Sequence, residues 1–308
     1  MNIVDRSFAQ LAREILSLSD KEMYHRMRKS FDRVPQVTQR NCMRYFNQYN
    51  YWGRLDIDQG VYEEIELKQK TLQQHMDDFA WLYGRLGDYR SKKTLYAILN
   101  NWYAYDFAST TQTKEYLFDS YFDLDLLQCS EQEVFVDLGA YTGDTVLSYL
   151  RNYGEDCYRR IYCYEITPQN FGYLKMNLEK YPNIDCRLKG VSDAPGRLFV
   201  QDNAASSSAN TLGETGGEAV DVVTLDDDIE QAVTLIKADI EGYEQKALRG
   251  AARHIANDHP RLLLSVYHSN DDLWQIPRMV DEYSGDYRFY LRYKSSPIYP
   301  TEIILFAL

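Results

Sequence analysis

The chain has 308 residues and a formal net charge of −12, and its length suggests one large or two modest domains. Its apolar fraction of 44% and charged fraction of 26% are those of a globular protein with a sizeable core. The negative charge argues against general binding to nucleic acid or to an anionic membrane surface. This charge is compatible with an uncharged or cationic small substrate.

No apolar run approaches the roughly 20 residues that a membrane helix needs. Charges are mixed through the first stretch of the chain, so we do not expect a signal peptide there. The five cysteines form no CxxC pair and are odd in number, which favours reduced thiols over disulfides or a zinc site. The expected compartment is the cytoplasm.

Residues 1 to about 127 have helical periodicity. Phe8, Leu11 and Ile15 recur at helical spacing, and so do apolar residues farther along (Ile65, Leu72, Met76, Phe79 and Leu82). The region is also rich in aromatic residues, and two interpretations stay open: packing between amphipathic helices, or a stacking platform for a sugar or aromatic substrate. We predict a helical N-terminal domain over 1–127 that caps a substrate or joins copies of the chain into a homo-oligomer.

From residue 128 onward, strand-like apolar runs alternate with helical patterns, which is typical of βαβ units and a parallel sheet. Seven strands are predicted, over 134–138, 161–165, 185–189, 235–240, 262–267, 287–293 and 302–307. Only a short loop with Pro297 and Pro300 separates the last two, so they should be antiparallel neighbours at the sheet edge. An extra hairpin is predicted from 197–201 and 219–225. The predicted fold class is α/β: a Rossmann-like, seven-stranded, mostly parallel sheet with an antiparallel edge hairpin, preceded by the helical domain.

The strongest motif is the turn after the first of these strands. Residues 134–145 read VFVDLGAYTGDT, and a helical pattern follows. Gly139 and Gly143 can adopt backbone angles closed to other residues and allow a ligand to approach the main chain. The helix N-terminus behind them offers free N–H groups. A dinucleotide site needs GxGxxG at this place, whereas this chain has GxxxG.

Two carboxylates accompany the turn, Asp137 in the strand and Asp144 at the helix start. They would repel a pyrophosphate but attract a cationic ligand that carries an ammonium group. S-adenosylmethionine, with its sulfonium and α-amino group, meets this electrostatic demand. The cofactor-binding residues predicted here are Asp137, Gly139, Ala140, Tyr141, Gly143, Asp144 and Thr145. The alternative is a turn without a ligand, in which Asp144 is the N-cap of the helix.

Further cofactor contacts are predicted after the next two strands. Glu165 ends the second strand, where a carboxylate can accept both ribose hydroxyls, with Ile166 beside it. Alternatively, Glu165 only caps the helix that begins after Pro168. Ser192 and Asp193 follow the third strand and are placed to meet the adenine edge, unless they form an ordinary turn.

The fourth predicted strand carries Lys237, Asp239 and Glu241 within the sequence LIKADIEGYE. Side chains alternate along a strand, so these three should share one side. Charges in a parallel strand are costly to bury unless they are paired, and ligands bind at the carboxyl edge of such sheets. We therefore predict that the charges serve a site. The alternative is a Lys237–Asp239 ion pair that steadies the strand.

Taken together, these motifs resemble the FkbM-type methyltransferases. The matching stretches are the DLGAYTGDT turn, Glu165, the KxDxEGxE run at 237–244, LRGA at 248–251, SVYH at 265–268, and YLR at 290–292. The resemblance covers about residues 117–308, and we predict an S-adenosylmethionine-binding domain over 128–308. It implies methyl transfer from S-adenosylmethionine, usually to a hydroxyl of a sugar or another secondary metabolite.

Methyl transfer to a hydroxyl benefits from a base within hydrogen-bond reach. The predicted catalytic residues are Asp239, His268 and Lys237. Asp239 and His268 lie at the ends of adjacent predicted strands and are the candidate bases, and Lys237 would hold the charge of Asp239. Asp239 is also a candidate contact for the methionine amino group. Alternatively, Asp239, Glu241 and His268 bind a divalent cation, although the main prediction includes no metal.

Two other functions stay open. The large tyrosine-rich N-terminal region is compatible with a catalytically inactive binding or scaffold protein on a methyltransferase fold. An NAD-dependent oxidoreductase is opposed by the missing GxGxxG.

Overall fold

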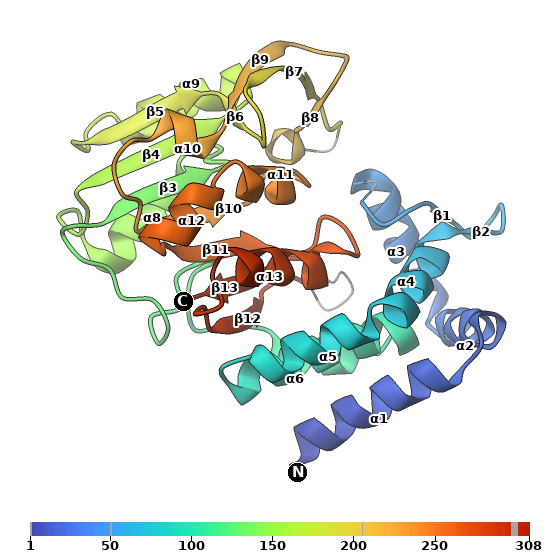
Figure 1. Ribbon diagram of the computed structural model, residues 1–308. Coiled ribbons are helices and arrows are strands. Elements are labelled where there is room, and N and C mark those ends of the chain that lie inside the picture. The colour runs from blue at the N-terminus through green and yellow to red at the C-terminus, as the bar shows by residue number, and fades with distance from the viewer. Residues whose placement is uncertain (1, 50, 205, 297–300) are drawn as a thin grey trace. The chain divides into compact units, whose positions relative to one another are not determined.

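The computed structural model describes residues 2–49, 51–204, 206–296 and 301–308 (Figure 1). The chain divides into two compact units. The first comprises Met1–Glu115, Val266–Arg278 and Arg288–Phe306, and the second comprises Tyr116–Ser265, Met279–Tyr287 and Ala307–Leu308. The domain boundary near residue 127 stays a prediction. Within the described ranges, no helix combines the length and the hydropathy of a bilayer-spanning segment.

Helices make up most of the first unit, as the periodicity predicted. They are α1 (Ile3–Ser17), α2 (Asp20–Asp32), α3 (Gln36–Tyr49), α4 (Glu63–Gln74), α5 (Met76–Arg85), α6 (Tyr89–Ala104) and α7 (Phe107–Thr113), with a short hairpin of β1 (Leu55–Asp56) and β2 (Val61–Tyr62). Ser19 starts α2 through a capping box with Glu22, which satisfies backbone donors at the helix start. Phe8, Leu11 and Ile15 form the buried face of α1.

A buried group of polar side chains lies inside this helical unit. Lys68 and Glu64 form an ion pair one turn apart on α4, and both are almost fully buried. The hydroxyl of Tyr105 donates to Glu64 at 2.8 Å, and the Lys68 ammonium lies 4.9 Å from the ring centroid of Phe46. Tyr103 and Tyr105 are themselves buried, so these two tyrosines pack between helices, as the first interpretation of the aromatic residues predicted.

The predicted α/β sheet is confirmed. Its seven strands have the order β12-β13-β11-β10-β3-β4-β5. Their bounds are β3 (Val134–Leu138), β4 (Arg160–Glu165), β5 (Ile184–Leu188), β10 (Leu235–Ala238), β11 (Arg261–Ser265), β12 (Phe289–Tyr293) and β13 (Ile303–Ala307). β10 pairs in parallel with β3 and β11, and β4 pairs in parallel with β3 and β5. β12 and β13 are neighbours at one edge, while the loop prolines Pro297 and Pro300 lie outside the described residues.

Helices connect these strands, with bounds α8 (Asp144–Tyr153), α9 (Pro168–Leu178), α10 (Leu225–Asp228), α11 (Glu244–Arg249), α12 (Ala252–Asp258) and α13 (Asp272–Tyr283). Every residue of β3 is buried, as expected for a strand with parallel neighbours on both sides. Pro168 stands in the first turn of α9, where its missing N–H costs no helical hydrogen bond. These connections bring the loops after β3, β4 and β10 to one edge of the sheet.

A second, four-stranded sheet is inserted between β5 and β10. Its strands are β6 (Gly190–Val191), β7 (Gly196–Gln201), β8 (Thr211–Gly213) and β9 (Ala219–Val223), in the order β6-β9-β7-β8, with a 3-10 turn η1 (Ser207–Ala209) before β8. The predicted hairpin is confirmed, because β7 and β9 pair antiparallel. β8 was missed, and its Leu212 joins Val200, Val220 and Val222 in a small apolar core.

Candidate functional site

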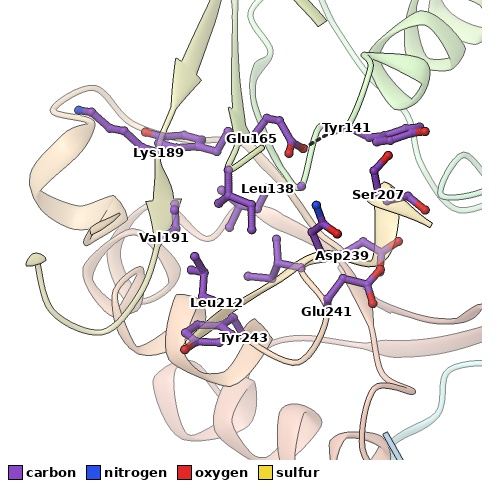
Figure 2. Close-up of a pocket in the computed structure, with 17 residues that line it drawn as sticks. Leu138, Tyr141, Glu165, Lys189, Val191, Ser207, Leu212, Asp239, Glu241 and Tyr243 are labelled. Atoms are coloured by element: carbon purple, nitrogen blue, oxygen red, sulfur yellow. Dashed lines mark hydrogen bonds between the residues drawn. The ribbon is translucent and has the colours of Figure 1, made fainter. Parts of the chain in front are cut away.

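A pocket lies at the carboxyl edge of the parallel strands in the second unit (Figure 2). It encloses about 540 Å³ of empty space, part of which is open solvent. The loop after β3 lines it with Leu138, Gly139 and Tyr141, the end of β4 with Tyr164, Glu165 and Ile166, and the loop after β10 with Asp239, Ile240, Glu241 and Tyr243. The inserted sheet completes the lining with Lys189, Gly190, Val191, Ser207, Ser208, Asn210 and Leu212.

The glycine turn after β3 is shaped by close backbone contact. Gly139 has φ +76°, and a Cβ at this position would stand 2.0 Å from the carbonyl oxygen of Asp239, so no other residue fits. The close approach at Gly139 is therefore to the loop after β10. Gly143, at φ 89°, is the N-cap of α8, which corrects the alternative that gave this place to Asp144.

Glu165 joins the first two loops of the pocket. One carboxylate oxygen accepts from the backbone N–H of Tyr141 at 3.0 Å, and the other accepts from Thr167 at 2.7 Å. Burial raises the pKa of Glu165, and the hydrogen bonds to Thr167 and Tyr141 oppose that rise. The carboxylate thus binds the residue before α9, which has no side-chain cap, and it also lines the pocket.

A buried ion pair lies across β3 and β10. The register places Lys237 beside Asp137, and the ammonium is 3.0 Å from that carboxylate. The cross-strand register thus pairs Lys237 with Asp137, whereas the predicted alternative paired it with Asp239. Lys237 also donates to the carbonyl oxygens of Leu138 at 3.2 Å and Gly139 at 2.8 Å, so it fixes the glycine turn.

Burial governs the protonation of this pair. It raises the pKa of Asp137 to about 6, although Lys237 pulls the value down. Burial alone would lower the pKa of Lys237, but the charges of Asp137 and Asp239 outweigh it and raise that pKa. Asp137, predicted as a cofactor contact, does not line the pocket.

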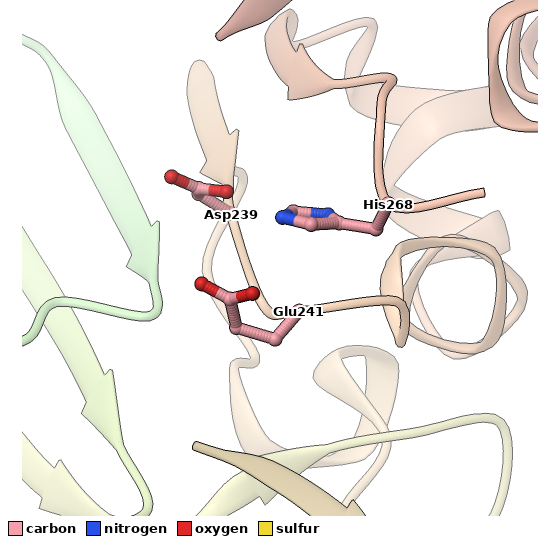
Figure 3. A group of neighbouring side chains, drawn as sticks. All are labelled: Asp239, Glu241 and His268. Atoms are coloured by element: carbon pink, nitrogen blue, oxygen red, sulfur yellow. The ribbon is translucent and has the colours of Figure 1, made fainter. Parts of the chain in front are cut away.

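Asp239 and Glu241 present two carboxylates at the loop after β10. β10 ends at Ala238 and Glu241 has φ 58°, so the predicted strand to Ile240 was too long and strand alternation does not apply here. Oxygens of the two carboxylates lie within 4.8 Å of each other, and Figure 3 shows both side chains leaving the loop toward the same side. The buried carboxylate of Glu244 fixes this loop by accepting from the backbone of Ile240 and Gly242.

The remaining predicted residues lie elsewhere. Ala140, Gly143, Asp144, Thr145, Ser192 and Asp193 are not among the residues that line the pocket. Asp193 instead forms an ion pair with Arg249 at 3.3 Å, and in this stretch Val191 lines the pocket. His268 belongs to the first unit, where its ring centroid lies 5.1 Å from that of Tyr51 and 4.2 Å from that of Tyr267.

Comparison with known proteins identifies the family. The model of the methyltransferase FkbM domain matches residues 137–295, just over half of the chain. The chain belongs to the FkbM methyltransferase family. No curated protein sequence matches it. The match covers the end of β3, the pocket loops and the inserted sheet, so the predicted resemblance is confirmed.

Solved structures are similar to this FkbM chain. A methyltransferase FkbM from Methylobacillus flagellatus is 25% identical with a TM-score of 0.67, over 86% of this chain and 70% of that one. Fibrillarin from Aeropyrum pernix, solved with S-adenosyl-L-methionine, is 14% identical with a TM-score of 0.38, over 59% of this chain and 70% of that one. An rRNA methylase from Streptococcus thermophilus is 13% identical with a TM-score of 0.37, over 58% of this chain and 87% of that one.

Proposed function

We propose that this FkbM-family protein binds S-adenosylmethionine in the pocket of Figure 2 and methylates a hydroxyl of a sugar or another small metabolite. The observation that carries the proposal is the charge of the lining. Glu165, Asp239 and Glu241 contribute three carboxylates, and Lys189 is the one cationic side chain among the described residues that line the pocket. Lys189 is itself paired with Asp228 at 2.8 Å.

This arrangement fits a cationic nucleoside better than a phosphate-bearing one. A pyrophosphate needs several N–H or cationic donors, and beside these carboxylates it would be repelled. A sulfonium and an ammonium group are attracted instead. Ile166, Val191 and Leu212 supply an apolar wall of the kind that an adenine ring requires.

Different residues of the pocket contact different parts of this cofactor. Glu165, held by two backbone N–H groups, keeps lone pairs for the ribose hydroxyls. Gly139 and Tyr141 bring the main chain to the ligand, and Asp239 takes the methionine ammonium or the acceptor hydroxyl. S-adenosylmethionine, when bound, supplies a methyl group activated by its sulfonium.

The acceptor hydroxyl must be oriented toward the methyl carbon at about 3 Å and must lose its proton. Asp239 and His268 are the proposed bases. β10 and β11 are parallel neighbours, and His268 follows the end of β11 by three residues. Three residues of chain span at most about 11 Å, and this short separation from the end of β11 supports the proposal for His268.

Calorimetry with S-adenosylmethionine tests the proposal. We expect saturable one-site binding by the wild type and none by Gly139→Val, whose side chain would meet the Asp239 carbonyl oxygen. Gly154→Val is the matched control, since Gly154 also has a positive φ of 100° but no atom within 4 Å of an added Cβ. Circular dichroism checks that both variants fold.

Turnover is measured with the methyl-labelled cofactor and a panel of hydroxylated sugars and phenols. A labelled ether product supports O-methylation. Absence of binding by the wild type contradicts the whole proposal, and binding without transfer to any acceptor in the panel favours a non-catalytic binding protein.

A further inference from the structure

Tyr121 lies outside every motif in the sequence and yet contacts the carboxylate that lines the pocket. Its phenolic hydroxyl donates to Asp239 at 2.7 Å and lies 3.1 Å from the hydroxyl oxygen of Ser265. Because the phenolic proton goes to Asp239, Ser265 is left to donate to the phenol. All three side chains belong to the second unit, from the segment before β3, the loop after β10 and the end of β11.

We propose that Tyr121 is a positioning residue for Asp239. The hydroxyl of Tyr121 takes one carboxylate oxygen of Asp239 and thereby turns the carboxylate toward the pocket. This inference rests on the proposed function, because it assigns Asp239 a contact with the bound cofactor or acceptor.

The backbone around Tyr121 is held in an unfavourable conformation. Tyr121 has φ 68°, the left-handed region that non-glycine residues rarely occupy, and its side chain is buried with 7% exposure. Such conformations persist only where the surrounding structure enforces them, and they are concentrated at functional sites. Here the enforced conformation delivers a single hydroxyl to Asp239.

Residues on both sides of Tyr121 in the sequence contact helix α8. The carboxylate of Asp119 accepts from Ser148 at 2.7 Å and from Arg151 at 2.6 Å, both on α8, and these hydrogen bonds lower the pKa of Asp119 to about 2. Phe122 is fully buried, and its ring centroid lies 5.7 Å from that of Tyr149 on the same helix. The residues around Tyr121 are thus anchored to the helix that follows the glycine turn.

Tyr121 also explains why Asp239 stays available to the pocket beside a buried lysine. The Lys237 ammonium lies 5.4 Å from the ring centroid of Tyr121, a favourable cation–π distance, while its ion pair is with Asp137. The ring therefore contacts the ammonium and the hydroxyl holds the carboxylate. One tyrosine thus contacts both Lys237, in β10, and Asp239, in the loop that follows it.

Tyr121→Phe removes only the hydroxyl and tests the inference in the full-length protein. We expect S-adenosylmethionine to bind about fivefold more weakly or worse, because a hydrogen bond to a charged partner is lost. Tyr158→Phe is the matched control: Tyr158 is also 7% exposed and donates at 2.7 Å, but to the carbonyl oxygen of Pro182 outside the pocket. Its dissociation constant should stay within about twofold of wild type.

A double-mutant cycle separates positioning from a purely structural role. If Tyr121 acts through Asp239, adding Tyr121→Phe to Asp239→Asn changes the dissociation constant by less than about twofold. Full additivity of the two losses would overturn the proposal.

A cofactor-free readout keeps the inference testable even where the proposed function fails. The carbon-13 resonance of the Asp239 side chain, assigned by its absence in Asp239→Asn, should move in Tyr121→Phe and stay in place in Tyr158→Phe. An unmoved resonance contradicts the inference about Tyr121. Absence of S-adenosylmethionine binding by the wild type contradicts the proposed function instead.

Discussion

Two buried lysine–carboxylate pairs stand in the two units of the molecule, and they are built differently. In the first unit, Lys68 and Glu64 lie one turn apart on α4, and Tyr105 donates to the same carboxylate at 2.8 Å. In the second unit, Lys237 and Asp137 meet across β10 and β3 at 3.0 Å, and Lys237 also donates to the carbonyl oxygen of Gly139.

The two pairs differ in what surrounds them: one lies in a core, and the other contacts the pocket. The carboxylate of Glu64 is satisfied by its own unit, so that pair closes a core. Lys237 instead uses its remaining donors on the turn that lines the pocket, and Asp137 has a pKa raised to about 6 by burial. Isolated buried ion pairs are weak contributors to net stability because desolvation is costly. The Lys237 pair is therefore best explained by the contacts of Lys237 with the turn that lines the pocket.

The largest expected effect comes from removing either lysine. Lys68→Met and Lys237→Met each leave a buried carboxylate without its cation, which lowers the free energy of unfolding by about 3–5 kcal/mol. Only Lys237→Met should also weaken S-adenosylmethionine binding, by about tenfold or more, because the Gly139 turn loses two donor contacts. Urea denaturation and calorimetry at a temperature where both variants are folded measure the two effects. Equal losses of binding in the two variants contradict the distinction.

The pH dependence of stability is the next effect. Burial raises the pKa of Asp137 to about 6 in the folded protein, whereas the ordinary pKa of an aspartate in an unfolded chain is about 4. The folded state therefore binds more protons than the unfolded state between these two pH values. The contribution of Asp137 to the free energy of unfolding therefore falls as pH rises from about 4 to 6, by up to about 3 kcal/mol, and is constant above. Asp137→Asn should flatten that part of the profile. Denaturation curves at stepped pH give the comparison.

The smallest expected effect comes from removing the hydroxyl of either of two tyrosines. Tyr105 and Tyr121 both have left-handed backbones, with φ 53° and 68°, and both donate to a carboxylate. Tyr105→Phe should cost about 1–2 kcal/mol of stability and leave S-adenosylmethionine binding unchanged. The same substitution at Tyr121 weakens binding. Weaker binding by Tyr105→Phe as well would contradict the distinction between the two tyrosines.

The sequence predicted the parts of the site that depend on local pattern. β3 has the predicted bounds 134–138, and Gly139, Tyr141, Glu165, Ile166 and Asp239 all line the pocket. These residues follow strands of a parallel sheet, so strand order and a glycine turn were sufficient to bring them together.

The sequence could not predict the contacts that depend on register or on rare backbone conformations. In the sequence, Asp137 and Asp239 are both possible ion-pair partners of Lys237. Only the cross-strand register shows that Asp137 lies beside the lysine. Glu241 itself has a left-handed backbone conformation, and the alternation of side chains along a strand does not predict such a residue. Tyr121 is 118 residues from Asp239, and no periodic pattern marks it. β8 is hidden in a small, polar stretch whose one large apolar residue is Leu212.

A crystal structure of the protein with S-adenosylmethionine tests the central claim most directly. We expect the ribose hydroxyls on the carboxylate of Glu165, the adenine against Ile166 and Leu212, and the cationic groups toward Asp239. A cofactor bound elsewhere, or bound here with its ribose turned away from Glu165, would contradict it.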